Sequence, residues 1–421
     1  LDYAVKDNVY DQEIIPYVKE LEKLLINEGY EPIEVIIKKS CEEINVILEN
    51  QYDLLNAVGD SKKEQKRKSS FYIGCLVRFI LSFLKNADVN DSISVEQPQL
   101  ITEINAAERN KFWKKSSENI EKVYDTFKNA NQSELSILRS QISDNAIKFS
   151  GKNETGIYTL EVPTGGGKTL TVLRYALNNA KIFHKDRIFY ITAYLSVLEQ
   201  NATEIKEVIH NDDYVLEHHS NIVKEEENDN ENEDDNPRFM WRQYLEDSWD
   251  SPIVLTTMVQ FFNTLFKGKS NNLRRFNQLK NSIIIIDEIQ SLPVKAVYNF
   301  NLTANFLKEV MNCNIVLCSA TQPLLDDESL DYKINYGNNN KINKNIIDLT
   351  IEQQQLFDRV HFINKTGDKA TDVMTTSELS ALAMDCAEKN NNVLIILNTK
   401  NAVKLLYEAI PDNFDGKLIY L

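Results

Sequence analysis

The sequence predicts an α/β fold in which a parallel sheet is covered by helices on both faces. From Gly156 onward, short apolar runs alternate with helical patterns, and each run is apolar along most of its length, as expected of strands buried on both faces. The predicted strands are Ile157–Val162, Arg187–Thr192, Pro252–Thr256, Ser282–Asp287 and Asn314–Ser319. A glycine-rich segment follows the first strand and two carboxylates end the fourth, so the sheet also organises the candidate site.

The residues before Gly156 carry helical patterns. Apolar residues recur at three- and four-residue spacing, which predicts amphipathic helices. The predicted helices are Tyr17–Leu25, Val35–Leu48, Phe71–Leu84, Asn105–Phe127 and Ser133–Phe149. The basic run 61–68 is expected to be a solvated loop, with a DNA contact as the alternative. Residues 91–100, which contain Pro98, are expected to be a connector.

A second αβ region begins near Arg359. Its pattern predicts strands at Val360–Ile363 and Val393–Leu397, helices at Ser377–Lys389 and Lys400–Ile410, and a last strand that enters Leu421. A domain of this kind needs ~150 residues, so we expect this region to be incomplete.

The composition is that of a globular protein, with 42% hydrophobic and 26% charged residues. The formal net charge is −16, and half of it comes from eight acids between Glu225 and Asp235, in a segment that we expect to be a disordered insertion. This acidity argues against an all-over basic nucleic-acid binder but permits a basic groove. The five cysteines form no C-x-x-C pair. We therefore predict a cytoplasmic protein with reduced thiols and no targeting or transmembrane segment.

The segment Val162–Thr169 has the features of a phosphate-binding loop. It reads Val-Pro-Thr-Gly-Gly-Gly-Lys-Thr between an apolar strand and an apolar helix. Glycines let successive backbone N–H groups converge on an anion at the start of a helix. Lys168 supplies a positive charge for the β- and γ-phosphates, and Thr169 is suited to the magnesium ion that accompanies ATP. Val162 stands where the strict pattern has its first glycine.

Two carboxylates, Asp287 and Glu288, follow the apolar run Ile283–Ile286. At the carboxyl end of a strand beside the phosphate loop, Asp287 is suited to hold magnesium through its water shell. Glu288 is suited to orient and deprotonate the attacking water.

Small residues follow the next predicted strand as Ser319, Ala320 and Thr321. Hydroxyl groups at this place can hydrogen-bond to the Asp287–Glu288 loop and sense the γ-phosphate. The order of phosphate loop, Asp-Glu and Ser-Ala-Thr resembles motifs I, II and III of superfamily two helicases. The resemblance implies that a RecA-like domain carries these motifs.

Around these motifs the chain resembles the CRISPR-associated helicase/nuclease that works with the type I Cascade surveillance complex. The supporting segments are Leu138–Ile142, Val162–Thr169, Ser196–Asn201, Glu217–Ser220, Thr256–Phe262, Asp287–Gln290, Ser319–Pro323 and Val393–Thr399, of which the last resembles motif IV. The resemblance implies an ATP-driven motor on single-stranded DNA, which unwinds and degrades invading DNA after recruitment by Cascade.

The same resemblance implies roles for individual residues. Gln141 and the loop residues Thr164, Gly165, Gly166, Gly167, Lys168 and Thr169 would contact the nucleotide. Thr169 and Asp287 would hold its magnesium, and Glu288 would be catalytic. Gln290 would link hydrolysis to the DNA track, and Ser319, Ala320 and Thr321 would couple the two. Candidate contacts to the DNA strand are Thr257 and Gln260.

That family carries an all-helical HD nuclease domain ahead of the helicase core, with metal held by several His and Asp residues. Phe79–Asp88 resembles the last helix of that domain and places Asp88 at the final ligand position, the alternative being a helix-ending carboxylate. All five histidines (His184, His210, His218, His219, His361) follow the phosphate loop. We therefore expect no transition-metal site to assemble from this chain.

The resemblance divides the chain into four regions. Residues 1–91 would be the C-terminal part of an HD domain and residues 92–135 a helical connector. Residues 136–335 would be the first RecA-like domain, with the acidic insertion at 224–237, and residues 336–421 an incomplete second one. Motifs V and VI lie beyond Leu421, so the chain is expected to be an N- and C-terminally truncated member that hydrolyses ATP poorly alone.

Two alternatives remain open. An RNA helicase of the DEAD/DEAH type has His or Asp where Gln290 stands, and a degenerate fragment would keep the fold without turnover. A P-loop kinase or transporter ATPase would need an acceptor pocket or an L-S-G-G-Q signature, which the sequence lacks.

His218 and His219 would point to opposite faces of a strand, which favours a structural or DNA-facing role over a shared metal.

Overall fold

The computed structural model describes most of the chain between residues 19 and 419. The described residues are 19–27, 29–40, 42–43, 46, 62–96, 104–130, 133–219, 237–338, 343–358, 360, 363–364, 373–389, 392–411 and 417–419. They fall into two compact units, Leu1–Phe357 and Asp358–Leu421. The predicted acidic insertion lies outside the described residues, apart from Pro237.

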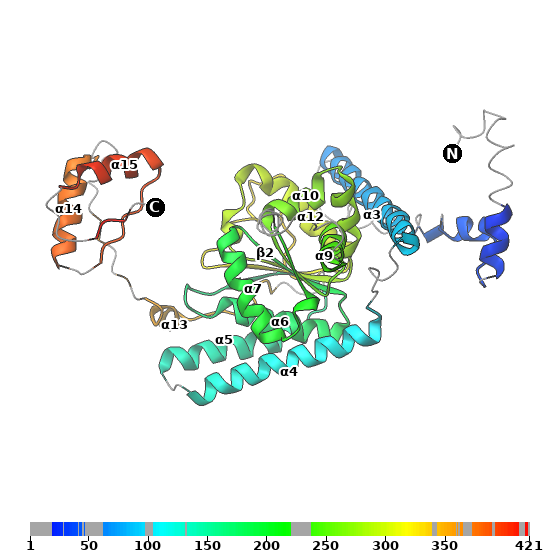
Figure 1. The fold of residues 1–421 in the computed structure, drawn as a ribbon, viewed down its shortest axis with the longest axis horizontal. Coiled ribbons are helices and arrows are strands. Elements are labelled where there is room, and N and C mark those ends of the chain that lie inside the picture. The colour runs from blue at the N-terminus through cyan, green and yellow to red at the C-terminus, as the bar shows by residue number, and fades with distance from the viewer. Residues whose placement is uncertain are drawn as a thin grey trace. The chain divides into compact units, whose positions relative to one another are not determined.

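A six-stranded parallel sheet forms the centre of the first unit (Figure 1). In spatial order its strands are β1 (Gly156–Glu161), β6 (Asn314–Ser319), β5 (Ser282–Ile286), β2 (Arg187–Thr192), β4 (Ile253–Thr257) and β3 (Val215–His218). The five predicted strands are confirmed to within one residue at each end, and β3 adds a sixth at the edge. β6 alone separates β1 from β5, so the segments that follow these three strands meet at the same edge of the sheet.

Helices cover both faces of the sheet, as predicted (Figure 1). One face packs against α4 (Ala106–Ala130), α5 (Glu134–Ser150), α6 (Lys168–Phe183) and α7 (Leu195–Ile209). The other packs against α3 (Lys62–Glu96), α9 (Pro237–Ser248), α10 (Met258–Phe266), α11 (Ser270–Phe276) and α12 (Val297–Glu309). Further short helices are η2 (Asp212–Tyr214), η4 (Asn277–Leu279), η5 (Ile289–Ser291), η6 (Val294–Ala296) and α13 (Ile351–Gln355).

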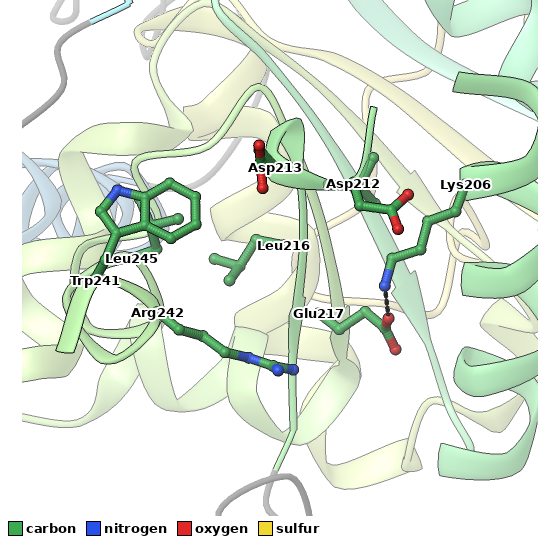
Figure 2. A pocket seen from close by; sticks show the side chains of 9 residues that line it. Lys206, Asp212, Asp213, Leu216, Glu217, Trp241, Arg242 and Leu245 are labelled. Carbon is green, nitrogen blue, oxygen red and sulfur yellow. Dashed lines mark hydrogen bonds and ion pairs between the residues drawn. The ribbon is translucent and has the colours of Figure 1, made fainter. Parts of the chain in front are cut away.

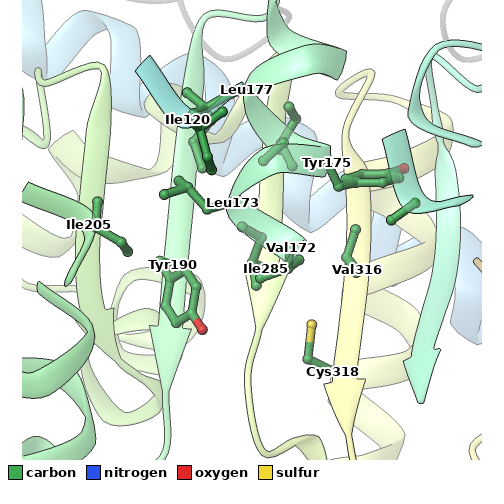
Figure 3. Packing of buried hydrophobic residues seen from close by; sticks show 14 of the residues in the cluster. Ile120, Val172, Leu173, Tyr175, Leu177, Tyr190, Ile205, Ile285, Val316 and Cys318 are labelled. Carbon is green, nitrogen blue, oxygen red and sulfur yellow. The ribbon is translucent and has the colours of Figure 1, made fainter. Parts of the chain in front are cut away.

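Two apolar cores result from the two-residue period of the strands. On β2, Ile188 and Tyr190 enter the core beneath α6, whereas Phe189 and Ile191 enter the opposite core. Figure 3 shows the first core, where Val172 of α6 lies near Ile285 and Tyr175 lies near Val316 of the sheet. Each such fully buried aliphatic side chain contributes about 1.5–3 kcal/mol, so the helix that follows the phosphate loop is held firmly against the sheet.

The α3 helix is longer than the sequence predicted. The basic run was expected to be a loop, but α3 begins at Lys62, because Lys, Glu, Gln and Arg are themselves strong helix formers. The helix also continues through the expected connector to Glu96. There the Ser92 hydroxyl donates to the carbonyl of Asp88, and the Ser94 hydroxyl donates to the carbonyl of Asp91, so these serines turn back onto their own helix.

By length and composition, Lys66–Val95 of α3 would suffice to cross a membrane. Its polar side chains nevertheless bind the sheet domain. The Tyr72 hydroxyl donates to Glu309, and the Arg78 guanidinium donates to the carbonyls of Thr264 and Lys267. One face of α3 is therefore part of the sheet domain's own packing.

The second unit contains α14 (Thr376–Lys389) and α15 (Lys400–Ala409), close to the predicted helices. No strand forms over 393–397, which corrects the prediction there. Leu394 and Ile396 are 79% and 83% exposed, and an apolar run becomes a strand only when a neighbour pairs with its backbone. The predicted strands at 360–363 and before Leu421 lie partly outside the described residues.

Candidate functional site

The phosphate loop runs from the end of β1 to the first residue of α6. Gly165 and Gly167 have φ angles of 81° and 79°, a backbone conformation that side chains disfavour. Gly166 is required for a different reason, since a Cβ there would lie 2.3 Å from Cγ1 of Val162. The buried Val162 side chain thus packs against the loop at Gly166, which explains why an apolar residue stands at this position.

Arg139 holds the loop from outside. This α5 side chain donates from Nε to the carbonyl oxygen of Gly165 at 2.8 Å. The sequence had pointed to Gln141 in the same segment, but Gln141 is exposed on α5. Sequence reasoning assigned Arg139 no role, although it quoted the segment that contains it.

Lys168, the first residue of α6, forms an ion pair with the second carboxylate. Its Nζ lies 3.0 Å from Oε1 of Glu288, and the two side chains are 14% and 30% exposed. Partial burial opposes ionisation of Glu288, but hydrogen bonds from Lys168 and Gln290 outweigh it and hold the pKa of Glu288 below its usual value. Glu288 has a φ angle of 54°, so the chain turns sharply immediately after β5.

Asp287 is the more buried of the two carboxylates. Its Oδ2 accepts a hydrogen bond from the Tyr190 hydroxyl at 3.1 Å, and its Oδ1 accepts one from the backbone N–H of Glu288 at 3.0 Å. Burial raises the pKa of Asp287, against the opposing effect of the Lys168 charge.

Thr169 is connected to the Tyr190 hydroxyl, and so to Asp287, through Asn201. Its hydroxyl is 3.3 Å from Oδ1 of Asn201, and Nδ2 of Asn201 is 3.5 Å from the hydroxyl of Tyr190. A polar connection therefore runs from Thr169 to Asp287 through two side chains that sequence reasoning gave no role. Asn201 stood in a quoted motif, whereas Tyr190 lies in an apolar strand and gave no signal.

Gln290 connects Glu288 to the end of β6. Its Nε2 donates to Glu288, and its Oε1 lies 2.6 Å from the hydroxyl of Ser319. The same hydroxyl accepts from the backbone N–H of Thr321 at 3.0 Å. The structure thus brings the Ser-Ala-Thr segment to the carboxylates, with Ala320 between two residues that make these contacts.

Two sets of predicted residues lie elsewhere. Thr257 caps α10, because its hydroxyl accepts from the backbone N–H of Gln260 at 3.4 Å. Asp88 is exposed on α3 and forms a surface ion pair with Lys85 at 2.9 Å. Among the described residues, no group of three or more His, Cys, Asp or Glu could hold a metal ion.

His218 is a core residue of β3. Its Nδ1 accepts a hydrogen bond from Nε1 of Trp249 at 3.2 Å. Burial, with a smaller effect from the charge of Arg275, lowers the pKa of His218 to about 3, so the ring stays neutral. This contact gives His218 a structural role, which is one of the two roles that the sequence favoured over a shared metal.

A separate hollow of about 150 Å³ lies beside the edge strand β3, and Figure 2 shows side chains that line it. Trp241, Leu216 and Leu245 supply apolar walls, and Lys206 and Glu217 form an ion pair at the rim. None of the described residues that line it belongs to the phosphate loop or follows β5 or β6. The hollow is therefore distinct from the candidate nucleotide site.

The residues at the sheet edge fit a magnesium-bound nucleoside triphosphate. The loop leaves no room for a Cβ at Gly166, and it precedes a 16-residue helix whose first turn carries no acidic residue. Helix starts of this kind bind anions. A hydroxyl from Thr169 and a carboxylate from Asp287 are oxygen ligands of the kind that magnesium prefers.

A family model matches the part of the chain that holds this site. The family model described as "Type III restriction enzyme, res subunit" matches residues 97–323, more than half of the chain. The CRISPR-associated nuclease/helicase Cas3 of Haloferax volcanii is 27% identical over 185 residues. That match covers 40% of this chain and 19% of the relative's length.

Solved structures match at lower similarity. The crystal structure of T. fusca Cas3 with AMPPNP is 20% identical, has a TM-score of 0.34, and is matched over 42% of this chain and 21% of that one. The DUF1998 helicase MrfA bound to DNA and AMPPNP is 14% identical, has a TM-score of 0.37, and is matched over 64% and 35% of the two chains.

The family match includes the phosphate loop, both carboxylates and the Ser-Ala-Thr segment. The chain therefore belongs to the family of the type III restriction enzyme res subunit, as a superfamily two helicase-type ATPase that is similar to Cas3.

Proposed function

We propose that this chain is the motor part of a DNA helicase and translocase that is driven by ATP hydrolysis. The observation that carries the proposal is the contact between Lys168 and Glu288, 3.0 Å apart, beside the Thr169 and Asp287 side chains. The segments that follow β1 and β5, two strands separated by β6, thus bring these four side chains together, which supports a nucleotide site there.

In this proposal each residue has one task. Lys168 and the backbone of Thr164–Gly167 bind the phosphates, and Thr169 and Asp287 hold the magnesium ion. When bound, magnesium neutralises charge on the phosphates. Glu288 accepts the proton of the attacking water, for which its ionised carboxylate is suited.

The remaining assignments belong to the same proposal. Gln141 contacts the nucleotide. Gln290 and the segment Ser319, Ala320 and Thr321 relay the state of the site, and Thr257 and Gln260 contact the DNA strand from the start of α10.

We also propose a place for the chain in a larger system. It works in the cytoplasm on single-stranded DNA, after recruitment by a Cascade-type complex. DNA is favoured over RNA because Gln290 stands where RNA helicases of the DEAD/DEAH type carry Asp or His.

Nuclease activity is not expected of this chain, which has no histidine before His184. Residues 1–91 are assigned to an HD-type domain with Asp88 at its end, residues 92–135 to a connector, and residues 136–335 and 336–421 to RecA-like regions.

The polypeptide alone is expected to turn over ATP slowly. Hydrolysis in such enzymes gains ~10³–10⁵ in rate from an arginine that reaches the γ-phosphate. Among the described residues, the cation that pairs with Glu288 is a lysine, Lys168, and not such an arginine, so we do not expect this gain in rate.

Steady-state ATPase measurements with single-stranded DNA, single-stranded RNA or no nucleic acid test the proposal. We expect stimulation by DNA, and its loss in Lys168→Ala. Lys181→Ala is the matched control, because Lys181 is exposed in the last turn of the same helix. Stimulation by RNA alone would favour the RNA helicase, and equal rates in Lys168→Ala and wild type would contradict the ATPase site. Added target-bound Cascade complex should raise DNA-dependent turnover if recruitment is correct.

A further inference from the structure

We propose that Tyr190 and Asn201 are positioning residues for the magnesium-bound nucleotide. Together they form a polar bridge, defined here as the chain Thr169–Asn201–Tyr190–Asp287, that orients both proposed magnesium ligands from behind. This inference rests on the proposed nucleotide function and adds two residues that do not touch the nucleotide themselves.

The hydrogen bonds of the bridge run from Thr169 toward Asp287. Tyr190 has a single hydroxyl proton, and the ionised Asp287 can only accept, so this proton goes to Oδ2 of Asp287 at 3.1 Å. The Tyr190 oxygen must then accept from Nδ2 of Asn201, at 3.5 Å. This leaves Oδ1 of Asn201 as the acceptor for the Thr169 hydroxyl, at 3.3 Å.

This direction has a chemical consequence at Thr169. Because the Thr169 hydroxyl gives its only proton to Asn201, both lone pairs of its oxygen are left for a cation. At the other end, Oδ1 and Oδ2 of Asp287 each accept one hydrogen bond, from the Glu288 backbone and from Tyr190. Each carboxylate oxygen keeps a further lone pair free for a water of the metal shell. The bridge thus presents oxygen lone pairs, rather than protons, to the metal.

Burial makes the bridge rigid. Tyr190 is 1% exposed and Asn201 and Asp287 are each 5% exposed, so water cannot replace the Asn201–Tyr190 and Tyr190–Asp287 hydrogen bonds without opening the core. Figure 3 shows Tyr190 on its strand, with the hydroxyl directed toward the arrowhead end of the sheet. The bridge connects α6, α7, β2 and the turn after β5, so the two magnesium ligands are positioned by four segments of the domain.

The test compares Tyr190→Phe and Asn201→Leu with wild type in binding of a fluorescent, non-hydrolysable ATP analogue, with magnesium and with EDTA. Partners behind a metal ligand typically contribute 10–100-fold to metal affinity. We expect the magnesium-dependent gain in affinity to fall about 10–100-fold in both variants, while affinity in EDTA stays within about twofold of wild type. The double variant should lose no more than the stronger single one, because the bridge acts as a unit.

Tyr175→Phe is the matched control. The Tyr175 hydroxyl is equally buried and donates to Oδ1 of Asn314 at 3.0 Å, and Asn314 begins β6 rather than ending it. This variant should keep the full magnesium response. Melting temperatures of all variants without nucleotide show that the folds are comparable.

A wild-type magnesium response in Tyr190→Phe and Asn201→Leu overturns the bridge while leaving the nucleotide site in place. Equal losses with magnesium and with EDTA also overturn it, because they indicate general loosening. Absence of any magnesium response in wild type instead overturns the proposed nucleotide function, and the bridge with it.

Discussion

The ammonium group of Lys168 lies 3.0 Å from Oε1 of Glu288, so the phosphate loop and the turn after β5 are joined by an ion pair. The lysine that would bind phosphate is thus paired with the carboxylate that would act as the base. A nucleotide must compete with Glu288 for this lysine, and binding therefore releases the carboxylate. The pair makes nucleotide affinity and base activity dependent on one contact.

Glu288→Gln separates these two effects. Hydrolysis is expected to fall ~10²–10⁴-fold, because glutamine cannot accept the proton of water. Affinity for ATP should be kept or rise a few-fold, since Lys168 loses a charged competitor whose interaction amounts to ~1 kcal/mol or less. Single-turnover hydrolysis and equilibrium binding measure the two quantities. Glu199→Gln, at an exposed position on α7, is the control, and unchanged hydrolysis in Glu288→Gln would exclude this residue as the base.

Ser319→Ala tests the connection between Gln290 and the Ser-Ala-Thr segment. The Ser319 hydroxyl lies 2.6 Å from Oε1 of Gln290, and Ser319 itself is fully buried. We expect the rate without DNA to change less than about threefold, because Glu288 and Lys168 remain in place. DNA stimulation should be largely lost, since the two segments are no longer connected. Ser329→Ala, at an exposed loop position, should behave as wild type. Full DNA stimulation in Ser319→Ala would contradict a coupling role.

The sequence predicted the sheet and the site segments because each depends on local pattern. The run Ile283–Ile286 is apolar at every position, which only a strand buried on both faces requires. The role of the Tyr190 hydroxyl could not be predicted from the sequence. In the run Arg187–Thr192 it has the pattern of an ordinary core residue, and its hydroxyl gains a role from Asn201 and from Asp287, which follows the neighbouring strand β5.

The errors have related causes. The basic run at 61–68 was expected to be a loop, but charged residues with long side chains continue a helix when its next turns pack against a domain. The apolar run 393–397 has a strand pattern, yet a strand also needs a partner, which pattern alone does not reveal. β3 has only four residues, two of them Glu217 and His218, and forms because β4 pairs with it.

Arg174→Met is expected to destabilise the first unit. The Arg174 side chain is 5% exposed on α6 and donates hydrogen bonds to both carboxylate oxygens of Glu121 and to Asp144. Its guanidinium also lies over the ring of Tyr124 in a cation–π contact. Removing it leaves two carboxylates without their main cation, which costs ~3–5 kcal/mol when both are buried. Because Glu121 and Asp144 are 41% and 35% exposed, we expect about 2–3 kcal/mol instead.

Urea unfolding at neutral pH measures this loss. Arg174→Lys should recover part of it, since lysine keeps the charge but not the two-pronged contact with Glu121. Lys333→Ala removes the exposed ion pair with Glu328 and is expected to change the free energy of unfolding by about 0.5 kcal/mol or less. Equal stability of Arg174→Met and wild type would show that the ion pairs of Arg174 with Glu121 and Asp144 do not stabilise the packing of α6 against α4 and α5.

His218 predicts a pH dependence of stability. Its pKa is about 3 in the folded protein, because of burial and the charge of Arg275, against ~6.5 for an unfolded histidine. Between these values the unfolded chain binds a proton that the folded chain does not, so the free energy of unfolding falls as the pH is lowered. The contribution is complete above pH ~6.5 and decreases by up to ~1.4 kcal/mol per pH unit toward pH 3.

His218→Asn isolates this contribution, because Oδ1 of asparagine can accept the Trp249 hydrogen bond in place of Nδ1 but does not titrate. Between pH 7 and pH 5, wild type should lose about 2 kcal/mol more than this variant in urea unfolding followed by tryptophan fluorescence. His210→Asn is the control, since His210 is exposed and has the left-handed backbone conformation that asparagine tolerates. It should keep the wild-type response to pH. If His218→Asn keeps it too, the buried ring is not the group that makes the folded state sensitive to acid.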